Sequence, residues 1–167
     1  MSRIVLIGAP GSGKSTVGHA LAAHLQWPFI DTDTLIELKA GKKITDIFVV
    51  DGEEIFRVME FETLKEVLQE NSAVISLGGG APISPQAQNE IRISTSTVIF
   101  LDVSLATAAP RVGFNRDRPL LLGNPRAQWQ ALSDKRRPIY EDLATHTVKV
   151  DDMNVDEIVA VIETMIP

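Results

Sequence analysis

The chain alternates short apolar runs with longer segments whose apolar residues recur at helical spacing. The first run, residues 4–7, consists of β-branched and leucine residues, which is typical of a strand buried on both faces. After it, Val17, Leu21 and Leu25 recur every four residues and therefore share one face of a helix. Pro28 ends that helix. Such alternation predicts βαβ units around a parallel sheet.

The same alternation continues to the end of the chain. The predicted strands are 4–7, 29–30, 73–77, 97–101 and 147–150. The predicted helices are 14–26, 32–40, 44–50, 52–70, 84–92, 104–112, 125–144 and 154–166. We find no internal repeat, low-complexity tract or linker, so we expect a single α/β domain over residues 1–167.

The amino-acid composition restricts the class of protein and the compartment in which we expect it. The 167 residues are 44% hydrophobic and 23% charged, as in an ordinary globular domain. No apolar run approaches the roughly 20 residues that cross a bilayer, and the apolar stretch near the start is too short for a signal peptide. The absence of cysteine excludes disulfides and fits a reducing compartment. We therefore expect a cytoplasmic protein that does not bind membranes.

Charge is unevenly distributed along the chain. The net charge of −6 argues against a nucleic-acid-binding protein, which needs a basic face. Within residues 111–137, however, seven basic residues stand against two acidic ones. A basic segment on an acidic body favours a local anion site. For Lys135, Arg136 and Arg137, a solvated helix face is an equally good explanation.

A phosphate-binding motif follows the first predicted strand. Residues 8–15, GAPGSGKS, match the P-loop pattern G-x-x-x-x-G-K-[ST] in full, between a strand and a helix. Its glycines let backbone N–H groups turn toward phosphates, and the helix that begins there points its positive end at them. Lys14 is suited to the β- and γ-phosphates of ATP, and the Ser15 hydroxyl to Mg²⁺.

Two carboxylates end the second predicted strand. The third strand, 73–77, carries no acid at its end, so another group must serve the metal ion. Asp31 and Asp33 lie at the carboxyl edge of the sheet, where α/β proteins bind ligands, and they could divide metal binding and proton acceptance. Capping of the helix 32–40 explains them equally well from the local pattern.

Three consecutive glycines, Gly78, Gly79 and Gly80, follow the third strand. Glycines at a strand end suit a place where a ligand lies directly against the backbone. A flexible turn is the alternative.

Taken together, several motifs resemble the shikimate kinase family over essentially the whole chain. They are the P-loop, Asp31-Thr32-Asp33, Phe56-Arg57, Gly78-Gly79-Gly80, Arg118-Pro119-Leu120-Leu121 and Lys135-Arg136-Arg137-Pro138-Ile139-Tyr140. The resemblance implies a three-layer P-loop kinase fold, with helices on both faces of a five-stranded parallel sheet of order 2-3-1-4-5. It also implies ATP-dependent phosphorylation of the 3-hydroxyl of shikimate, a step of aromatic amino-acid biosynthesis, by a cytoplasmic monomer that uses Mg²⁺.

The resemblance also implies roles for individual residues. The implied ATP-binding residues are Gly11, Ser12, Gly13, Lys14, Ser15, Thr16, Arg111 and Arg118. The implied shikimate-binding residues are Asp33, Arg57, Gly78, Gly79, Gly80 and Arg136. Ser15 and Asp31 would serve Mg²⁺, and the catalytic residues would be Asp33, Lys14 and Arg118.

Two segments are also marked by the resemblance: a shikimate-binding segment at about 32–60 and a lid at about 112–124. The family's adenine loop usually carries a proline near its end, whereas the corresponding segment here, 150–156, has none.

Two other functions fit part of the motif set. The first is another small-molecule kinase, such as a gluconate or nucleoside-monophosphate kinase. A nucleoside monophosphate would need more basic groups around its site and a different lid, whereas Arg57, Arg136 and Asp33 favour a polyhydroxy acid. The second is a regulatory module that binds ATP without turnover. Such a module needs neither a base such as Asp33 nor a lid arginine such as Arg118.

Overall fold

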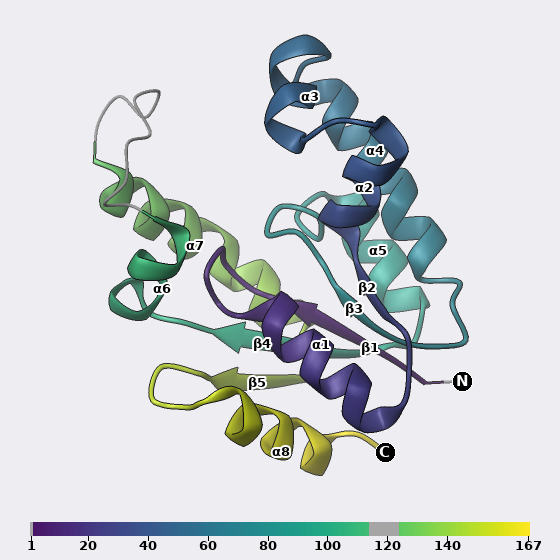
Figure 1. The fold of residues 1–167 in the computed structure, drawn as a ribbon, viewed down its shortest axis with the longest axis vertical. Coiled ribbons are helices and arrows are strands. Elements are labelled where there is room, and N and C mark those ends of the chain that lie inside the picture. Colours follow the sequence, from purple (N-terminus) through teal and green to yellow (C-terminus); the bar gives the residue numbers. More distant parts are fainter. Residues whose placement is uncertain (1, 114–123) are drawn as a thin grey trace.

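The computed structural model describes residues 2–113 and 124–167, which form a parallel sheet flanked by helices (Figure 1). The strands are β1 (Ser2–Ile7), β2 (Phe29–Asp31), β3 (Ser72–Ser76), β4 (Thr97–Asp102) and β5 (His146–Lys149). Their order is β2-β3-β1-β4-β5, and every pairing is parallel. The predicted sheet and its strand order are confirmed.

Eight helices connect and flank the strands within the described residues. They are α1 (Lys14–Leu25), α2 (Thr32–Ala40), α3 (Ile44–Val50), α4 (Glu53–Val67), α5 (Pro85–Ile93), α6 (Leu105–Val112), α7 (Pro125–Leu143) and α8 (Val155–Met165). Their ends agree with the predicted ends to within three residues. Among these helices, none combines the length and apolar character needed to span a membrane.

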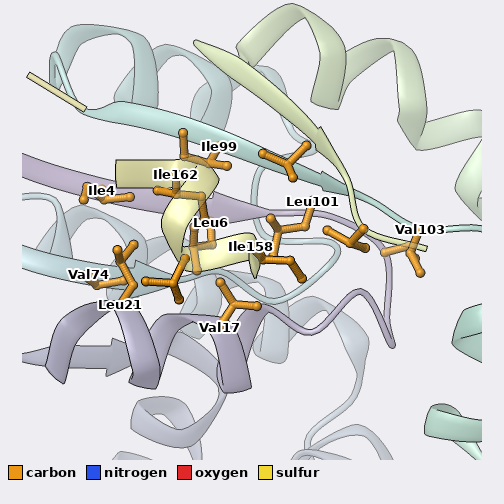
Figure 2. Close-up of a cluster of buried hydrophobic side chains, with 14 of the residues drawn as sticks. Ile4, Leu6, Val17, Leu21, Val74, Ile99, Leu101, Val103, Ile158 and Ile162 are labelled. Carbon is orange, nitrogen blue, oxygen red and sulfur yellow. The ribbon is translucent and has the colours of Figure 1, made fainter. Parts of the chain in front are cut away.

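Successive residues of β1 point to opposite faces of the sheet, and each face has its own core. Ile4 and Leu6 pack with residues of α1 and α8, a cluster that Figure 2 shows. Val5 and Ile7 pack with residues of α4, α5 and α7 on the other face. Because both faces are covered, the central strands read as continuous apolar runs. The predicted three-layer arrangement is confirmed.

The carboxyl edge of the sheet collects the segments that carry candidate chemistry. The P-loop follows β1, α2 follows β2, and the glycine triplet follows β3. Beyond this edge, α2, α3 and α4 form a projecting lobe (Figure 1) with a small core of Ile36, Ile47 and Phe56. The site therefore lies where the lobe meets the sheet edge.

Candidate active site

The P-loop has the backbone conformation that its glycines predict. Gly11 and Gly13 have φ angles of 82° and 93°, in the left-handed region that residues with a Cβ rarely adopt. Gly13 is the N-cap of α1, so the N–H groups of the first turn face the loop. The sequence thus forms an anion-binding concavity at the end of β1.

Lys14 lies across the loop that precedes it. Its Nζ donates hydrogen bonds to the carbonyl oxygens of Gly8 at 2.8 Å and Ala9 at 3.1 Å. Burial lowers the pKa of Lys14 to about 8, although the charges of Asp33 and Asp31 oppose the shift. The ammonium group is therefore partly shielded from water, and its attraction to a phosphate is stronger there than in bulk water.

Asp31 caps α2, which is one of the two explanations that the sequence left open, and its carboxylate also faces the P-loop. Its Oδ1 accepts hydrogen bonds from the backbone N–H groups of Asp33 at 3.0 Å and Thr34 at 3.2 Å, and so caps α2. Its Oδ2 accepts a hydrogen bond from Ser15 Oγ at 2.6 Å. One carboxylate thus holds the helix and faces the P-loop.

Ser15 and Asp31 present hard oxygen donors of the kind that Mg²⁺ prefers. Within residues 2–113 and 124–167, no group of three or more His, Cys, Asp or Glu side chains could hold a metal ion alone. These donors fit an ion that takes its remaining ligands from phosphate oxygens and water.

Asp33 lies against the first glycine of the triplet. A Cβ added to Gly78 would fall 2.5 Å from Asp33 Oδ1, so a glycine is needed for this carboxylate to sit here. Burial raises the pKa of Asp33 to about 6, and the charges of Asp31 and Glu60 add to the shift. The pKa is thereby moved toward neutrality, where a general base works best.

Two arginines lie against the other two glycines. A Cβ on Gly80 would fall 2.6 Å from Arg57 Nη1, and one on Gly79 would fall 3.1 Å from Arg136 Nη1. The groups that approach the triplet are therefore side chains of the protein itself. Arg57 comes from α4 in the lobe and Arg136 from α7, so the fold brings together residues far apart in the sequence.

Two buried polar residues support this arrangement, and the sequence analysis assigned a role to neither of them. Glu60, 5% exposed, accepts a hydrogen bond from Arg57 Nη1 at 2.8 Å. Tyr140, 1% exposed, donates its hydroxyl to the Gly79 carbonyl at 2.6 Å. The spacing of Glu60, three residues after Arg57 on a helix, was the available signal. Tyr140 belongs to the motif 135–140 that carries the family resemblance, but nothing in the sequence assigns it this contact.

Arg111 and Trp129 hold the outer side of the P-loop. Arg111 Nη1 donates to the Gly11 carbonyl at 3.0 Å. Trp129 Nε1 donates to the Pro10 carbonyl at 3.0 Å, so this buried side chain also fixes the loop. Arg111 therefore lies beside the phosphate-binding loop.

The two arginines of the basic run 135–137 contact different parts of the protein. Arg136 faces the glycine triplet, whereas Arg137 forms an ion pair with Asp102 at the end of β4. Hydrogen bonding to Asp102 is the main reason why the pKa of Arg137 is raised. A uniformly solvated helix face therefore does not describe these two arginines.

Two cavities open on these residues. The larger, about 670 Å³, is lined by the P-loop, Asp33, Gly78 and Gly79 and extends to Arg111 and residues 153–155. The smaller, about 290 Å³, is lined by Arg57, Glu60, Gly80 and Arg136. Most of the predicted lid, including Arg118, lies outside the described residues, and its role stays a prediction.

A phosphate-binding loop stands beside a carboxylate with a pKa near neutrality, and both face a pair of arginines. This combination, on a parallel sheet with the P-loop after β1, defines a P-loop kinase that phosphorylates a small molecule. A family model described as "Shikimate kinase" matches residues 10–167. The chain belongs to the shikimate kinase family.

Related proteins match this chain over nearly its full length. The chain is 47% identical to a shikimate kinase of Thermobifida fusca over 163 residues, which covers 98% of this chain and 94% of that protein. It is 42% identical to a shikimate kinase of Mycobacterium tuberculosis over 153 residues, which covers 91% and 86%. The predicted family and enzyme class are confirmed.

Solved structures show the same fold. Shikimate kinase from Acinetobacter baumannii in complex with shikimate has a TM-score of 0.91 and 30% identity, and the match covers 99% of this chain and 92% of that one. Shikimate kinase from Aquifex aeolicus has a TM-score of 0.80 and 35% identity, with coverage of 98% and 95%. A gluconokinase from Sinorhizobium meliloti, at 21% identity, covers 95% and 87% with a TM-score of 0.54, and shares the fold alone.

Proposed function

We propose that this shikimate kinase transfers the γ-phosphoryl group of ATP to the 3-hydroxyl of shikimate through the residues described above. The observation that supports the proposal is the position of Asp33. It contacts the glycine triplet that also receives Arg57 and Arg136, and its charge acts on Lys14 of the P-loop. An acceptor held by the arginines therefore lies beside a base and beside the phosphates.

The arginines are suited to the carboxylate of shikimate. A guanidinium group presents paired N–H donors that match the two oxygens of a carboxylate. Arg57 and Arg136 approach neighbouring glycines, so two such groups converge on one small region. Glu60 holds Arg57 by a hydrogen bond of 2.8 Å from inside the protein and limits its movement.

Transfer then depends on Asp33 and the P-loop. Asp33 accepts the proton of the 3-hydroxyl as that oxygen bonds to the γ-phosphorus, and the bond from phosphorus to the β,γ-bridging oxygen breaks to release ADP. Lys14 exchanges its hydrogen bonds to Gly8 and Ala9 for the phosphate oxygens. When Mg²⁺ is bound with ATP, near Ser15 and Asp31, it neutralises phosphate charge. Arg118 would add a further positive charge.

The nucleotide base would occupy the outer part of the larger cavity. Arg111 and Met153 both line this part, so a flat aromatic ring could lie between a guanidinium group and an apolar side chain. The segment 150–156 contributes its wall without the proline usual in the family. Our proposal further includes a single domain and a monomeric, cytoplasmic enzyme.

The first test is ADP release by the purified protein with Mg·ATP. Shikimate should stimulate release strongly, whereas gluconate and AMP should not. Turnover with gluconate or AMP but not with shikimate would contradict the assigned acceptor and leave the P-loop kinase class intact. ATP binding with no turnover for any acceptor would favour a regulatory module instead.

A further inference from the structure

Arg136 and Arg137 are neighbours on α7, but they serve different surfaces. Arg136 reaches the glycine triplet, where a Cβ on Gly80 would fall 3.2 Å from its Nη2. Arg137 Nη1 donates to Asp102 Oδ2 at 3.0 Å, and Arg137 Nη2 donates to Asp102 Oδ1. Arg137 therefore binds Asp102, at the end of β4, through both terminal nitrogens of its guanidinium group.

The ion pair belongs to a packed group that ties α7 to the sheet at two points. The guanidinium carbon of Arg137 lies 5.5 Å from the centroid of the Phe100 ring. That ring lies 5.2 Å from the ring of Tyr140, whose hydroxyl binds the Gly79 carbonyl at 2.6 Å. One turn of helix, 136–140, is thus attached both to β4 and to the loop after β3.

This turn needs external support because α7 contains Pro138. Proline has no backbone N–H, so the helix loses the hydrogen bond that would join residue 138 to the carbonyl of Asp134. The interrupted bond spans Arg136. The helix itself therefore restrains the direction of the Arg136 side chain less than an unbroken helix would. Contacts between α7 and the sheet must supply the missing restraint.

The partner of Arg137 is held firmly. The side chain of Asp102 is 13% exposed, and the backbone carbonyl of the same residue accepts a hydrogen bond from Val150 N at 3.0 Å. Both carboxylate oxygens of Asp102 accept hydrogen bonds from Arg137, so this side chain is fully engaged by the arginine.

We propose that Asp102 and Arg137 are positioning residues that set the direction of Arg136 and hence the affinity for the acceptor carboxylate. The inference rests on the proposed role of Arg136. Loss of the pair lets the turn 136–140 shift, so the guanidinium group of Arg136 no longer meets the carboxylate in the productive geometry. The P-loop, which is held by other residues, keeps its affinity for ATP.

The principal variant is Asp102→Asn, which keeps the side-chain shape and removes the charge. We expect KM and the calorimetric Kd for shikimate to rise about 3- to 10-fold. KM for ATP and kcat should stay within about two-fold of wild type. Arg137→Lys keeps the charge but lacks the two-pronged contact, and it should raise KM for shikimate in the same direction.

A matched control is Asp142→Asn. Asp142 also lies on α7 and pairs with Arg92 of α5, but both side chains of this pair are exposed. This variant removes an ion pair from the same helix without touching the turn 136–140. KM for shikimate should therefore stay at the wild-type value. Equal effects of Asp102→Asn and Asp142→Asn would overturn the inference, because any loosening of α7 would then suffice.

A shikimate analogue whose carboxylate is replaced by a carboxamide distinguishes a misplaced Arg136 from a general loss of active-site structure. Wild type should bind it weakly, and Asp102→Asn should lose little further affinity for it. Equal losses for shikimate and the carboxamide, or parallel losses in kcat and KM for ATP, would also contradict the inference. So would an unchanged KM for shikimate in both Asp102→Asn and Arg137→Lys.

Arg136→Lys distinguishes failure of the inference from failure of the proposed function. If this variant raises KM for shikimate and the Asp102 and Arg137 variants do not, the positioning role is wrong and the carboxylate role of Arg136 stands. If Arg136→Lys leaves KM unchanged, the proposed role of Arg136 is wrong and the inference fails with it.

Discussion

Alanine substitutions at the first and third glycines of the triplet should change different kinetic parameters, although the two residues are only two positions apart. Gly78 and Gly80 have backbone angles that alanine can adopt, so the added methyl group is the main perturbation. In Gly78→Ala the new Cβ meets Asp33 Oδ1 at 2.5 Å. In Gly80→Ala it meets Arg57 Nη1 at 2.6 Å. One variant therefore displaces the proposed base and the other a proposed carboxylate ligand.

The size of each effect follows from the distances. Ordinary contacts begin near 3.4 Å, so the displaced atom must move by about 0.8–0.9 Å. A misplacement of about 1 Å at a reacting group lowers activity by up to roughly 10²-fold. We expect Gly78→Ala to lower kcat by about 10- to 100-fold. Gly80→Ala should raise KM for shikimate by a similar factor, because the shift also strains the hydrogen bond from Arg57 to Glu60.

Steady-state kinetics with shikimate and ATP varied separately measure both parameters. Thermal unfolding checks that each variant folds, and KM for ATP should change little in Gly80→Ala. The same kinetic profile for both variants would refute the reasoning, since it would show that the triplet responds as one loop. Wild-type kinetics in Gly78→Ala would show that Asp33 can move without loss of catalysis.

Further substitutions test other parts of the site. Lys14→Ala should reduce kcat by about 10³-fold or more while circular dichroism stays unchanged, because the P-loop loses its positive charge; near-normal turnover would contradict this role. Asp33→Asn should lower kcat roughly 10²-fold or more in steady-state assays, and an effect on KM alone would reduce Asp33 to a binding residue. Glu60→Gln should gain stability relative to wild type as the pH rises above about 4.5, because burial raises the pKa of Glu60 and the folded wild-type protein therefore loses stability when this group ionises. Unfolding temperatures measured from pH 4 to 8 should diverge in that direction, and a constant difference would show that ionisation of Glu60 does not affect stability.

Much of the fold could be predicted because its signals are local. The apolar run before the P-loop and the helix pattern after it lie within a few residues of each other, and the predicted strand order agrees with the structure. The order itself came from a family resemblance. Periodicity alone identifies strands without saying which of them are neighbours.

Asp31 shows where local pattern was insufficient. From the sequence, helix capping and a function at the metal side were equal alternatives. The structure shows that the two oxygens point in different directions, one to the first turn of α2 and the other to Ser15. The packing of β2 beside β3, with the P-loop nearby, lets one carboxylate cap α2 and contact Ser15 at the same time.

The phosphate-binding loop, the α/β class and the residue types available for chemistry could be predicted from the sequence, because these features depend on short segments. The environment of those residues arises only from the folded arrangement. Folding buried Asp33 and Lys14 enough to shift their pKa values toward neutrality, and it placed Arg57 and Arg136 of two distant helices against one glycine triplet. It also paired Arg137 with Asp102 while leaving Arg136 directed at the triplet. Burial and contacts between distant residues arise only when the chain is folded, so neither can be read from the order of residues alone.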